Sequence, residues 1–194
     1  MNALEGALAR IGRDLDELGH PWALVGALAV ATYAEARATL DVDVAVAVDG
    51  PADSAALVAA LRDRGYGWQA DFGSAMTSLI VPGDGTPAGL RLDLLFALAG
   101  IEAEVARGAE RLTIVPGLVL PVAQRGDLIA LKLLAAGEPG REHDRRDLRA
   151  LVAGAGASDF KRARAAIDLL ASRGAAPLRQ LDRELAEIAG EQRG

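Results

Sequence analysis

The chain has 194 residues, a net charge of −6 and no cysteine. This length suffices for one domain, or for a core with an added subdomain, that folds without disulfides. The net negative charge argues against a protein that binds nucleic acid through a basic surface over the whole molecule. No apolar stretch is long enough to cross a bilayer. We therefore expect a cytoplasmic protein that does not enter a membrane.

The first two thirds of the chain mix helix and strand signals. Leucine and isoleucine at helical spacing predict an N-terminal helix over Leu4–Leu18, ended by Gly19. Alternation and capping signals predict the next elements. These are a strand at Trp22–Val25, a helix at Leu28–Ala36, a strand at Asp41–Val48, a helix that Ser54 caps and that runs to Arg64, and strands at Gly67–Phe72, Thr77–Val81 and Leu90–Phe96, the last two joined by a turn at 82–87.

The last third is predicted to be helical. Two weaker strands, Glu110–Val115 and Leu118–Ala123, precede it. The expected helices are Asp127–Ala136, Glu142–Val152, Ser158–Ser172 and Pro177–Ile188. The pattern predicts a mixed α/β part over residues 1–121 and a helical part over residues 122–194.

The charge is distributed unevenly between these two parts. Residues 1–121 carry 8 basic and 16 acidic side chains, a net −8, whereas residues 122–194 carry 13 and 11, a net +2. A polyanionic partner would favour the helical part, where Arg141, Arg145, Arg146 and Arg149 cluster. Because acids are interspersed among these arginines, a solvated helix face is the alternative.

Three acidic residues in two predicted strands are the most informative feature. Asp41 and Asp43 alternate with valines in D-V-D-V-A-V-A-V, so both lie on one face. Asp93, in L-R-L-D-L-L-F, joins them if its strand is the neighbour, about 4.8 Å away. At an effective dielectric constant of about 20, two carboxylates about 6 Å apart repel by roughly 3 kcal/mol. Three of them predict a bound cation, and oxygen ligands without cysteine favour Mg²⁺ or Mn²⁺.

This acidic cluster suits phosphoryl or nucleotidyl transfer, and nearby residues fit the same chemistry. Gly26 lies between a strand and a helix, where free N–H groups favour a phosphate. Arg37 is placed to contact phosphate, and Thr39 to hydrogen-bond near the metals or to cap the start of the strand. Each also has a structural interpretation, and so do the acids, as an exposed strand face.

Lys132 is one of only two lysines, and it lies inside the apolar helix L-I-A-L-K-L-L-A-A. A compact ammonium suits a triphosphate oxygen or a leaving pyrophosphate, although a lysine at the edge of a helix is the alternative. Asp144 and Asp147 lie on one side of a later helix. One of them is a candidate to orient Lys132 or an arginine, or to act as a base towards an acceptor hydroxyl.

Five short motifs, in this order and spacing, carry a resemblance to a known family: V-G-A-L-A-V, A-R-A-T-L-D-V-D-V, R-L-D-L-L, I-A-L-K-L-L-A and R-E-H-D-R-R-D-L. Together they resemble the AbiEii-type nucleotidyltransferases of the DNA polymerase β-like superfamily, which serve as toxins in type IV toxin–antitoxin systems. The resemblance covers about residues 20–152. It implies an α+β fold, with a small mixed sheet, flanking helices and a helical C-terminal subdomain, and the use of Mg²⁺ and a nucleoside triphosphate.

The resemblance also implies roles for single residues. Asp41, Asp43 and Asp93 would be the metal carboxylates, Gly26 would begin the phosphate-facing loop, Lys132 would hold phosphate, and Asp144 would be the acid of the last motif. At the loop the family has Gly-Gly or Gly-Ser, whereas this chain has Gly26-Ala27. Ala27 keeps its backbone N–H but lacks a hydroxyl and resists positive φ.

We therefore predict an Mg²⁺-dependent nucleotidyltransferase that moves a nucleoside monophosphate to a hydroxyl of RNA, such as a tRNA end, or of a protein. It would act like a toxin, with a possible cognate antitoxin, and would use its basic helical part for docking. One alternative is transfer to a small molecule of the aminoglycoside type, which the −8 of residues 1–121 favours. The other is a non-catalytic protein of the same fold that binds a nucleotide or a partner.

Overall fold

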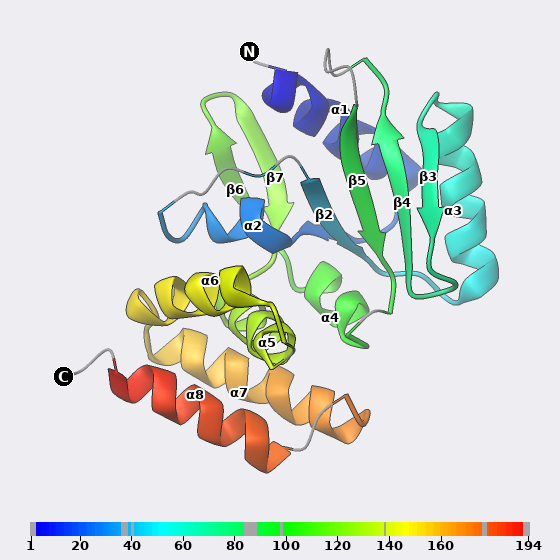
Figure 1. Ribbon diagram of the computed structural model, residues 1–194. Helices are drawn as coiled ribbons and strands as arrows, with labels where there is room; N and C mark the ends of the chain where they lie inside the picture. The colour runs from blue at the N-terminus through cyan, green and yellow to red at the C-terminus, as the bar shows by residue number, and fades with distance from the viewer. Residues whose placement is uncertain are drawn as a thin grey trace.

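The computed structural model describes residues 3–35, 39, 41–83, 89–97, 99–137, 139–175 and 178–191. Within them, a mixed sheet with helices on both faces is followed by a bundle of helices (Figure 1). The strands are β1 (Trp22–Leu24), β2 (Asp41–Val46), β3 (Gly67–Asp71), β4 (Met76–Val81), β5 (Leu90–Leu95), β6 (Glu110–Val115) and β7 (Leu118–Val122). The helices are α1 (Ala3–Leu18), α2 (Gly26–Val30), α3 (Pro51–Asp63), α4 (Glu102–Arg107), α5 (Arg125–Ala136), α6 (Glu142–Ala153), α7 (Ala157–Ser172) and α8 (Leu178–Glu191).

The sheet has seven strands in the order β3-β4-β5-β2-β1-β7-β6. The pairs β2–β5 and β1–β7 are parallel, and the other neighbouring pairs are antiparallel. β4 and β5 form the predicted antiparallel pair, although most of the turn between them lies outside the described residues. The mixed sheet with flanking helices and a helical C-terminal part confirms the predicted fold class.

The alternation of β2 separates an apolar face of the sheet from a polar one. Val42, Val44 and Val46 are fully buried on one face, and Trp22, the partner of Val46, packs there near Gly12 of α1. Helices α1 and α3 cover this face. The acids of β2 therefore lie on the opposite face, which is turned towards α2 and the C-terminal helices (Figure 1).

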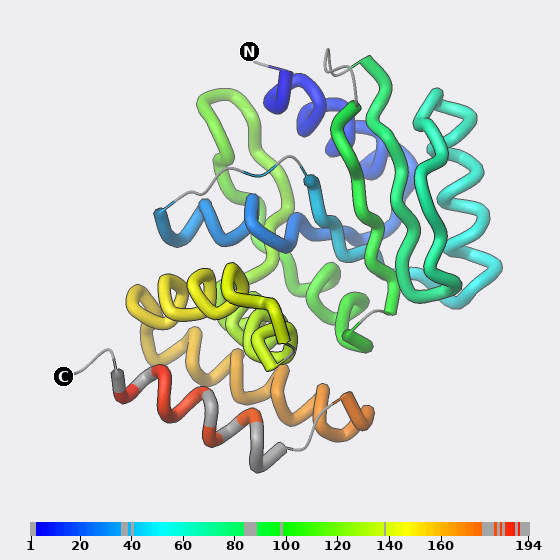
Figure 2. Tube along the Cα trace, in the orientation of Figure 1, coloured from blue at the N-terminus to red at the C-terminus, as the bar shows by residue number. Residues whose placement is uncertain are grey.

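The C-terminal helices pack around α5, which contacts α6, α7 and α8 and also reaches α2 next to the sheet. Leu128, Ile129 and Leu133 of α5 are at most 1% exposed. In the tube trace, α1 and α8 lie at opposite ends of the molecule, with α5 between them (Figure 2). Helix α5 is therefore the centre of the helical bundle, and it contacts α2 together with α6.

Two predicted helix starts are wrong. The predicted helix at Leu28–Ala36 begins two residues earlier, because the positive φ of Gly26, 63°, turns the chain directly from β1 into α2. Its end was also predicted wrongly, since the helix stops at Val30 and residues 31–33 form turns. Ser54 is not the N-cap of α3, since Gly50 holds that position and Pro51 begins the helix. Ser54 instead donates its hydroxyl to the carbonyl of Pro51.

Helix α4 was not predicted from the sequence. It is only six residues long and has no side-chain cap, so its signals are weak. The other boundaries differ from the prediction by the small shifts usual at the ends of elements. The boundary at residue 121 stays a prediction; β7 ends at Val122 and α5 begins at Arg125. Among the described residues, no helix has the length and apolar character needed to span a membrane.

We predict that Gly126→Ala lowers the free energy of unfolding by about 1–3 kcal/mol, as overpacking typically does. A Cβ at Gly126 would approach the backbone oxygen of Asp159 to 2.5 Å, so α5 and α7 would have to move apart. Gly6→Ala in α1 is the matched control, because nothing lies within 4 Å of its Cβ. That variant should gain roughly 0.5–1 kcal/mol from helix propensity. Urea unfolding of both variants checks this, and equal effects would contradict it.

Candidate active site

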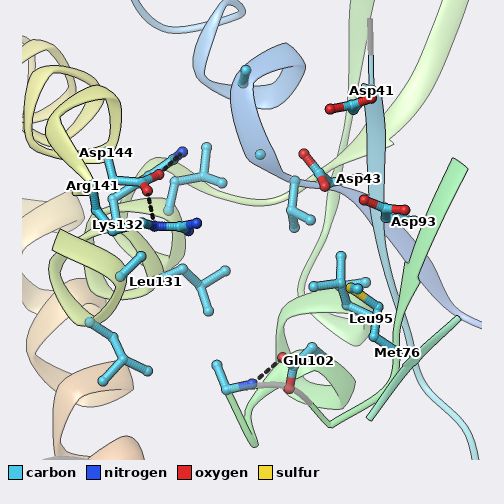
Figure 3. Close-up of a pocket in the computed structure, with 18 of the residues that line it drawn as sticks. Asp41, Asp43, Met76, Asp93, Leu95, Glu102, Leu131, Lys132, Arg141 and Asp144 are labelled. Carbon is cyan, nitrogen blue, oxygen red and sulfur yellow. Dashed lines mark hydrogen bonds and ion pairs between the residues drawn. The ribbon is translucent and has the colours of Figure 1, made fainter. Parts of the chain in front are cut away.

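The three acids identified in the sequence lie on one face of neighbouring strands. In the parallel β2–β5 pair, Asp43 is directly opposite Asp93, and Asp41 is opposite Arg91. Neighbouring strands are about 4.8 Å apart, so the Asp43 and Asp93 side chains project side by side. Figure 3 shows the three carboxylates along one wall of a cleft. Alternation predicted that Asp41 and Asp43 share one face of β2, and the strand register places Asp93 beside them.

Asp43 is the most perturbed of these acids. The pKa of Asp43 is raised from 3.8 to about 6. Burial is the largest cause, and the negative charge of the neighbouring Asp93 is the second. Gly26 lies against it, because a Cβ at that position would overlap the Asp43 carboxylate. None of the described residues donates a hydrogen bond to this carboxylate or forms an ion pair with it. Asp43 is thus a half-buried acid that faces the cleft and has no hydrogen-bond or ion-pair partner among the described residues.

The other two acids have partners on the sheet. The Ser78 hydroxyl donates to Asp93 Oδ1 at 2.5 Å, and the Arg91 Nε lies 3.2 Å from Asp93 Oδ2. The same guanidinium reaches Asp41, with its terminal nitrogen 2.8 Å from Asp41 Oδ2. One arginine therefore bridges two of the three predicted metal carboxylates.

A cationic group lies on the opposite wall of the cleft. The Lys132 ammonium of α5 is 2.6 Å from Asp144 Oδ1 and 2.8 Å from Asp147 Oδ2 of α6. All three side chains are at most 10% exposed. Buried charges require such pairing, and the paired acids hold the ammonium at the cleft wall. Lys132 lies across the cleft from Asp43 (Figure 3), and its positive charge opposes the rise in the pKa of Asp43.

Asp144 organises more than Lys132. Its Oδ2 lies 2.7 Å from Arg141 Nε and 3.1 Å from His143 Nε2. Both residues line the cleft, as Lys132 does. Both carboxylate oxygens therefore lie close to cationic or donor groups, and the orienting role of Asp144 stays a prediction.

The cleft between the two walls has a volume of about 1170 Å³. Beyond the acids its lining is largely apolar, and Glu102 at this end accepts hydrogen bonds from the backbone N–H groups of Ala99 and Gly100. The apolar lining is Val25, Ala45, Met76, Leu95, Ala99, Leu128, Leu131, Leu134, Ala135 and Ala175. The space exceeds the few hundred cubic ångströms of a small ligand site, so it has room for a nucleotide and part of an acceptor.

The remaining predicted residues are placed as follows. Gly26 and Ala27 line the cleft, and Ala27 is a buried residue of α2 without a positive φ. The strain expected at Ala27 is therefore absent, since Gly26 alone makes the turn. The Thr39 hydroxyl accepts a hydrogen bond from the Asp41 N–H at 3.3 Å, which fits the predicted cap at the start of the strand. Arg37 lies outside the described residues.

Sequence reasoning missed Ser78 and Arg91 as polar residues of the site, named Arg141 only as part of a basic cluster, and did not select His143. Arg91 had a visible signal, because it stands two residues before Asp93 and so points to the same face of β5. Ser78 had none, since its contact depends on the β4–β5 register. Arg141 and His143 flank Asp144 in sequence, and their approach to it depends on the turn that begins α6.

The donor set matches the oxygen ligands that Mg²⁺ and Mn²⁺ prefer, and the desolvated Asp43 carboxylate gives such an ion a reason to bind. In the described residues, however, no group of three acidic, histidine or cysteine side chains is already arranged to hold a metal ion. The Arg91 guanidinium contacts the oxygens that a cation would use. The carboxylates are therefore of the kind that binds a divalent cation, but the oxygens that Arg91 contacts would become available only after Arg91 has moved.

The sequence profile described as "Nucleotidyl transferase AbiEii toxin, Type IV TA system" matches residues 7–193. The chain belongs to the AbiEii nucleotidyltransferase family. This match spans nearly the whole chain and confirms the family that the five motifs predicted, and with it a nucleotidyltransferase. A comparison with curated proteins finds no match.

Solved structures similar to this AbiEii-family protein share its fold at low identity. An antigenic nucleotidyltransferase-like protein from Paracoccidioides brasiliensis has 17% identity and a TM-score of 0.57, covering 92% of both chains. The antibiotic-resistance factor ANT(2'')-Ia has 16% and 0.55, covering 88% of this chain and 94% of that one. The lincosamide antibiotic adenylyltransferase LnuA, bound to lincomycin, has 15% and 0.51, covering 78% and 98%.

We predict that Gly26→Ala is more damaging than the strain of its backbone alone explains. A residue with a Cβ at positive φ costs roughly 1–2 kcal/mol, and here the Cβ would also push the Asp43 carboxylate aside. Gly19→Ala separates the two effects, because Gly19 has φ 78° and nothing within 4 Å of its Cβ. Unfolding free energies should fall in both variants, but further in Gly26→Ala. A fall of the same size in both would rule out the close approach to Asp43.

The raised pKa of Asp43 predicts a pH-dependent penalty in the metal-free protein. The unfolded chain releases this proton near pH 3.8 and the folded chain near pH 6, so stability is lost as pH rises between these values. Asp43→Asn removes the penalty, which amounts to about 3 kcal/mol at most for a shift of roughly two units. In EDTA, urea unfolding should show the variant more stable than the wild type at pH 8, with the difference shrinking towards pH 4. A constant difference would contradict this.

Proposed function

We propose that the protein transfers a nucleoside monophosphate from a nucleoside triphosphate to an acceptor hydroxyl, using Mg²⁺ or Mn²⁺. The observation that carries this proposal is the opposition of two walls in one cleft. Asp41, Asp43 and Asp93 form the anionic wall, and Lys132, held by Asp144, forms the cationic wall. A metal-bound triphosphate needs both, because its cation seeks carboxylates and its remaining negative charge seeks an ammonium.

We assign the metal-binding role to Asp41, Asp43 and Asp93. A divalent cation held there would polarise the α-phosphate and lower the cost of ionising the attacking hydroxyl. Asp43 is the central ligand of the proposal, because it lies beside Asp93 and one alternation from Asp41. Its ionisation, which burial disfavours in the free protein, would be restored by the cation.

Lys132 is proposed to hold the β- and γ-phosphates and the departing pyrophosphate. Asp144 acts through it as a positioning residue, together with Asp147. Gly26 and Ala27 line the cleft as well, and we propose that their backbone faces the phosphates. Thr39 supports the start of β2 through the backbone of Asp41, so its contribution is to placement of that acid.

We propose RNA, such as a tRNA end, as the acceptor. Residues 122–194 carry a net +2. Among their arginines, Arg141 lines the cleft and is half exposed, and Arg146 of α6 is exposed. Of the acids in the cleft, Asp41, Asp93, Asp144 and Glu102 all have partners, which leaves Asp43 alone to attract a polycationic acceptor of the aminoglycoside type. As in the family's type IV toxin–antitoxin systems, we include a cognate antitoxin in the proposal; cytoplasmic location stays a prediction from the sequence.

The test is transfer of label from α-labelled nucleoside triphosphates, with Mg²⁺ or EDTA, to total tRNA, cellular protein or an aminoglycoside. We expect label on tRNA only, and only with Mg²⁺. Label on protein or on the aminoglycoside would replace the proposed acceptor. Absence of transfer to every acceptor, by folded protein with each of the four triphosphates, would contradict the proposal.

Lys132→Met should reduce the rate of transfer by about 100-fold or more, because a preorganised charge on the transferring phosphates is worth several kcal/mol. Lys161→Met is the matched control, since Lys161 is the only other lysine and is exposed. Circular dichroism should show that both variants fold. Equal activity of the two variants would remove Lys132 from the proposed site.

A further inference from the structure

We infer that Arg91 is a built-in counter-ion that competes with the divalent cation for Asp41 and Asp93, and that a bound nucleoside triphosphate releases it. This inference rests on the proposed function and adds a form of regulation to the same site. The Arg91 guanidinium lies 2.8 Å from Asp41 Oδ2 and 3.2 Å from Asp93 Oδ2. It thus occupies oxygens on two of the three proposed metal ligands.

The competition follows from which oxygens remain available. Ser78 holds Asp93 Oδ1, and Arg91 holds Asp93 Oδ2. Asp41 gives its Oδ2 to the same arginine, so within the described residues Asp43 alone offers an unpartnered carboxylate. A cation that binds Asp43 and takes Asp41 Oδ2 or Asp93 Oδ2 as a further ligand must displace the guanidinium. In agreement, no trio of ligands among the described residues is preassembled.

Arg91 is free enough to move. Its side chain is 45% exposed, and that of Asp41 is 42% exposed, so their ion pair is weakened by solvent. The pairing of β2 with β5 does not depend on this side chain, because backbone hydrogen bonds link the strands over their whole length. The contact can therefore break without unfolding the sheet.

A triphosphate gives the displaced guanidinium a new partner. Arginine can bind one phosphate group with two parallel N–H donors, whereas here Arg91 contacts each of the two acids through one nitrogen. Arg91 lines the same cleft as Lys132 on the other wall. The binding of nucleotide and the binding of metal then strengthen each other. The nucleotide attracts Arg91 away from the acids, and the cation binds the carboxylate oxygens that Arg91 has released. By linkage, each ligand must tighten the other by the same factor.

The test measures binding of Mn²⁺ to the metal-free protein, by calorimetry or electron paramagnetic resonance, with and without a non-hydrolysable nucleoside triphosphate. Arg91→Met should bind Mn²⁺ about tenfold more tightly than the wild type without nucleotide, within the 5–150-fold range of typical couplings. The gain in Mn²⁺ affinity caused by nucleotide should be smaller in the variant. Arg62→Met is the matched control. It removes the same charge, but Arg62 belongs to α3 and lies over the ring of Trp68 of β3, and it does not line the cleft.

Unchanged or weaker Mn²⁺ binding by folded Arg91→Met, relative to Arg62→Met, would overturn the inference. Arg91→Gln replaces Arg91→Met if the latter does not fold. Asp43→Asn distinguishes this failure from failure of the proposed function. If Asp43→Asn abolishes Mn²⁺ binding while Arg91→Met leaves it unchanged, only the counter-ion role is wrong. If Asp43→Asn binds Mn²⁺ as the wild type does, the metal site itself is wrong.

Discussion

The parallel pairing of β2 with β5 is the constraint on which the site depends, because it sets Asp43 directly beside Asp93. The valines that alternate with the acids are buried in the core, so neither strand can slip by one residue without exposing them. Gly26 packs directly against the Asp43 carboxylate and so limits its contact with water. The hydrophobic core thus forces two carboxylates together in a place where their charge is poorly solvated, and the surroundings must supply positive charge.

Positive charge comes from both walls of the cleft, but in different forms. Arg91 is half exposed and contacts the acids directly, whereas Lys132 is buried and already bound by two carboxylates of α6. A buried ion pair seldom adds much stability over apolar packing. The Lys132 pair makes better sense as a means of placing one ammonium at a fixed point. The helical part therefore holds the Lys132 ammonium in a fixed place, whereas the sheet supplies Arg91, whose contact with the acids is half exposed.

The sequence was sufficient for features with a local signal. The period of two in D-V-D-V gave the face of the acids, and the scarcity of lysine singled out Lys132. The start of α2 at Gly26 was missed because it depends on a positive φ rather than on a capping residue. The contact of Ser78 with Asp93 needs the β4–β5 register, and the bridge from Arg91 to Asp41 needs the β2–β5 register. The sequence of a single strand does not determine its register with a neighbouring strand, so neither contact could be predicted.

The choice of acceptor cannot come from the fold, since proteins as different as LnuA and ANT(2'')-Ia share it at 15% and 16% identity. It must come from the side chains around the acids. In this chain the acids on the cleft wall hold an arginine, a serine and a lysine, and Glu102 holds backbone N–H groups. These contacts leave Asp43 as the one acid of the cleft without a hydrogen-bond or ion-pair partner among the described residues. Recognition of the proposed anionic acceptor would fall to the apolar end of the cleft and to the arginines of the helical part.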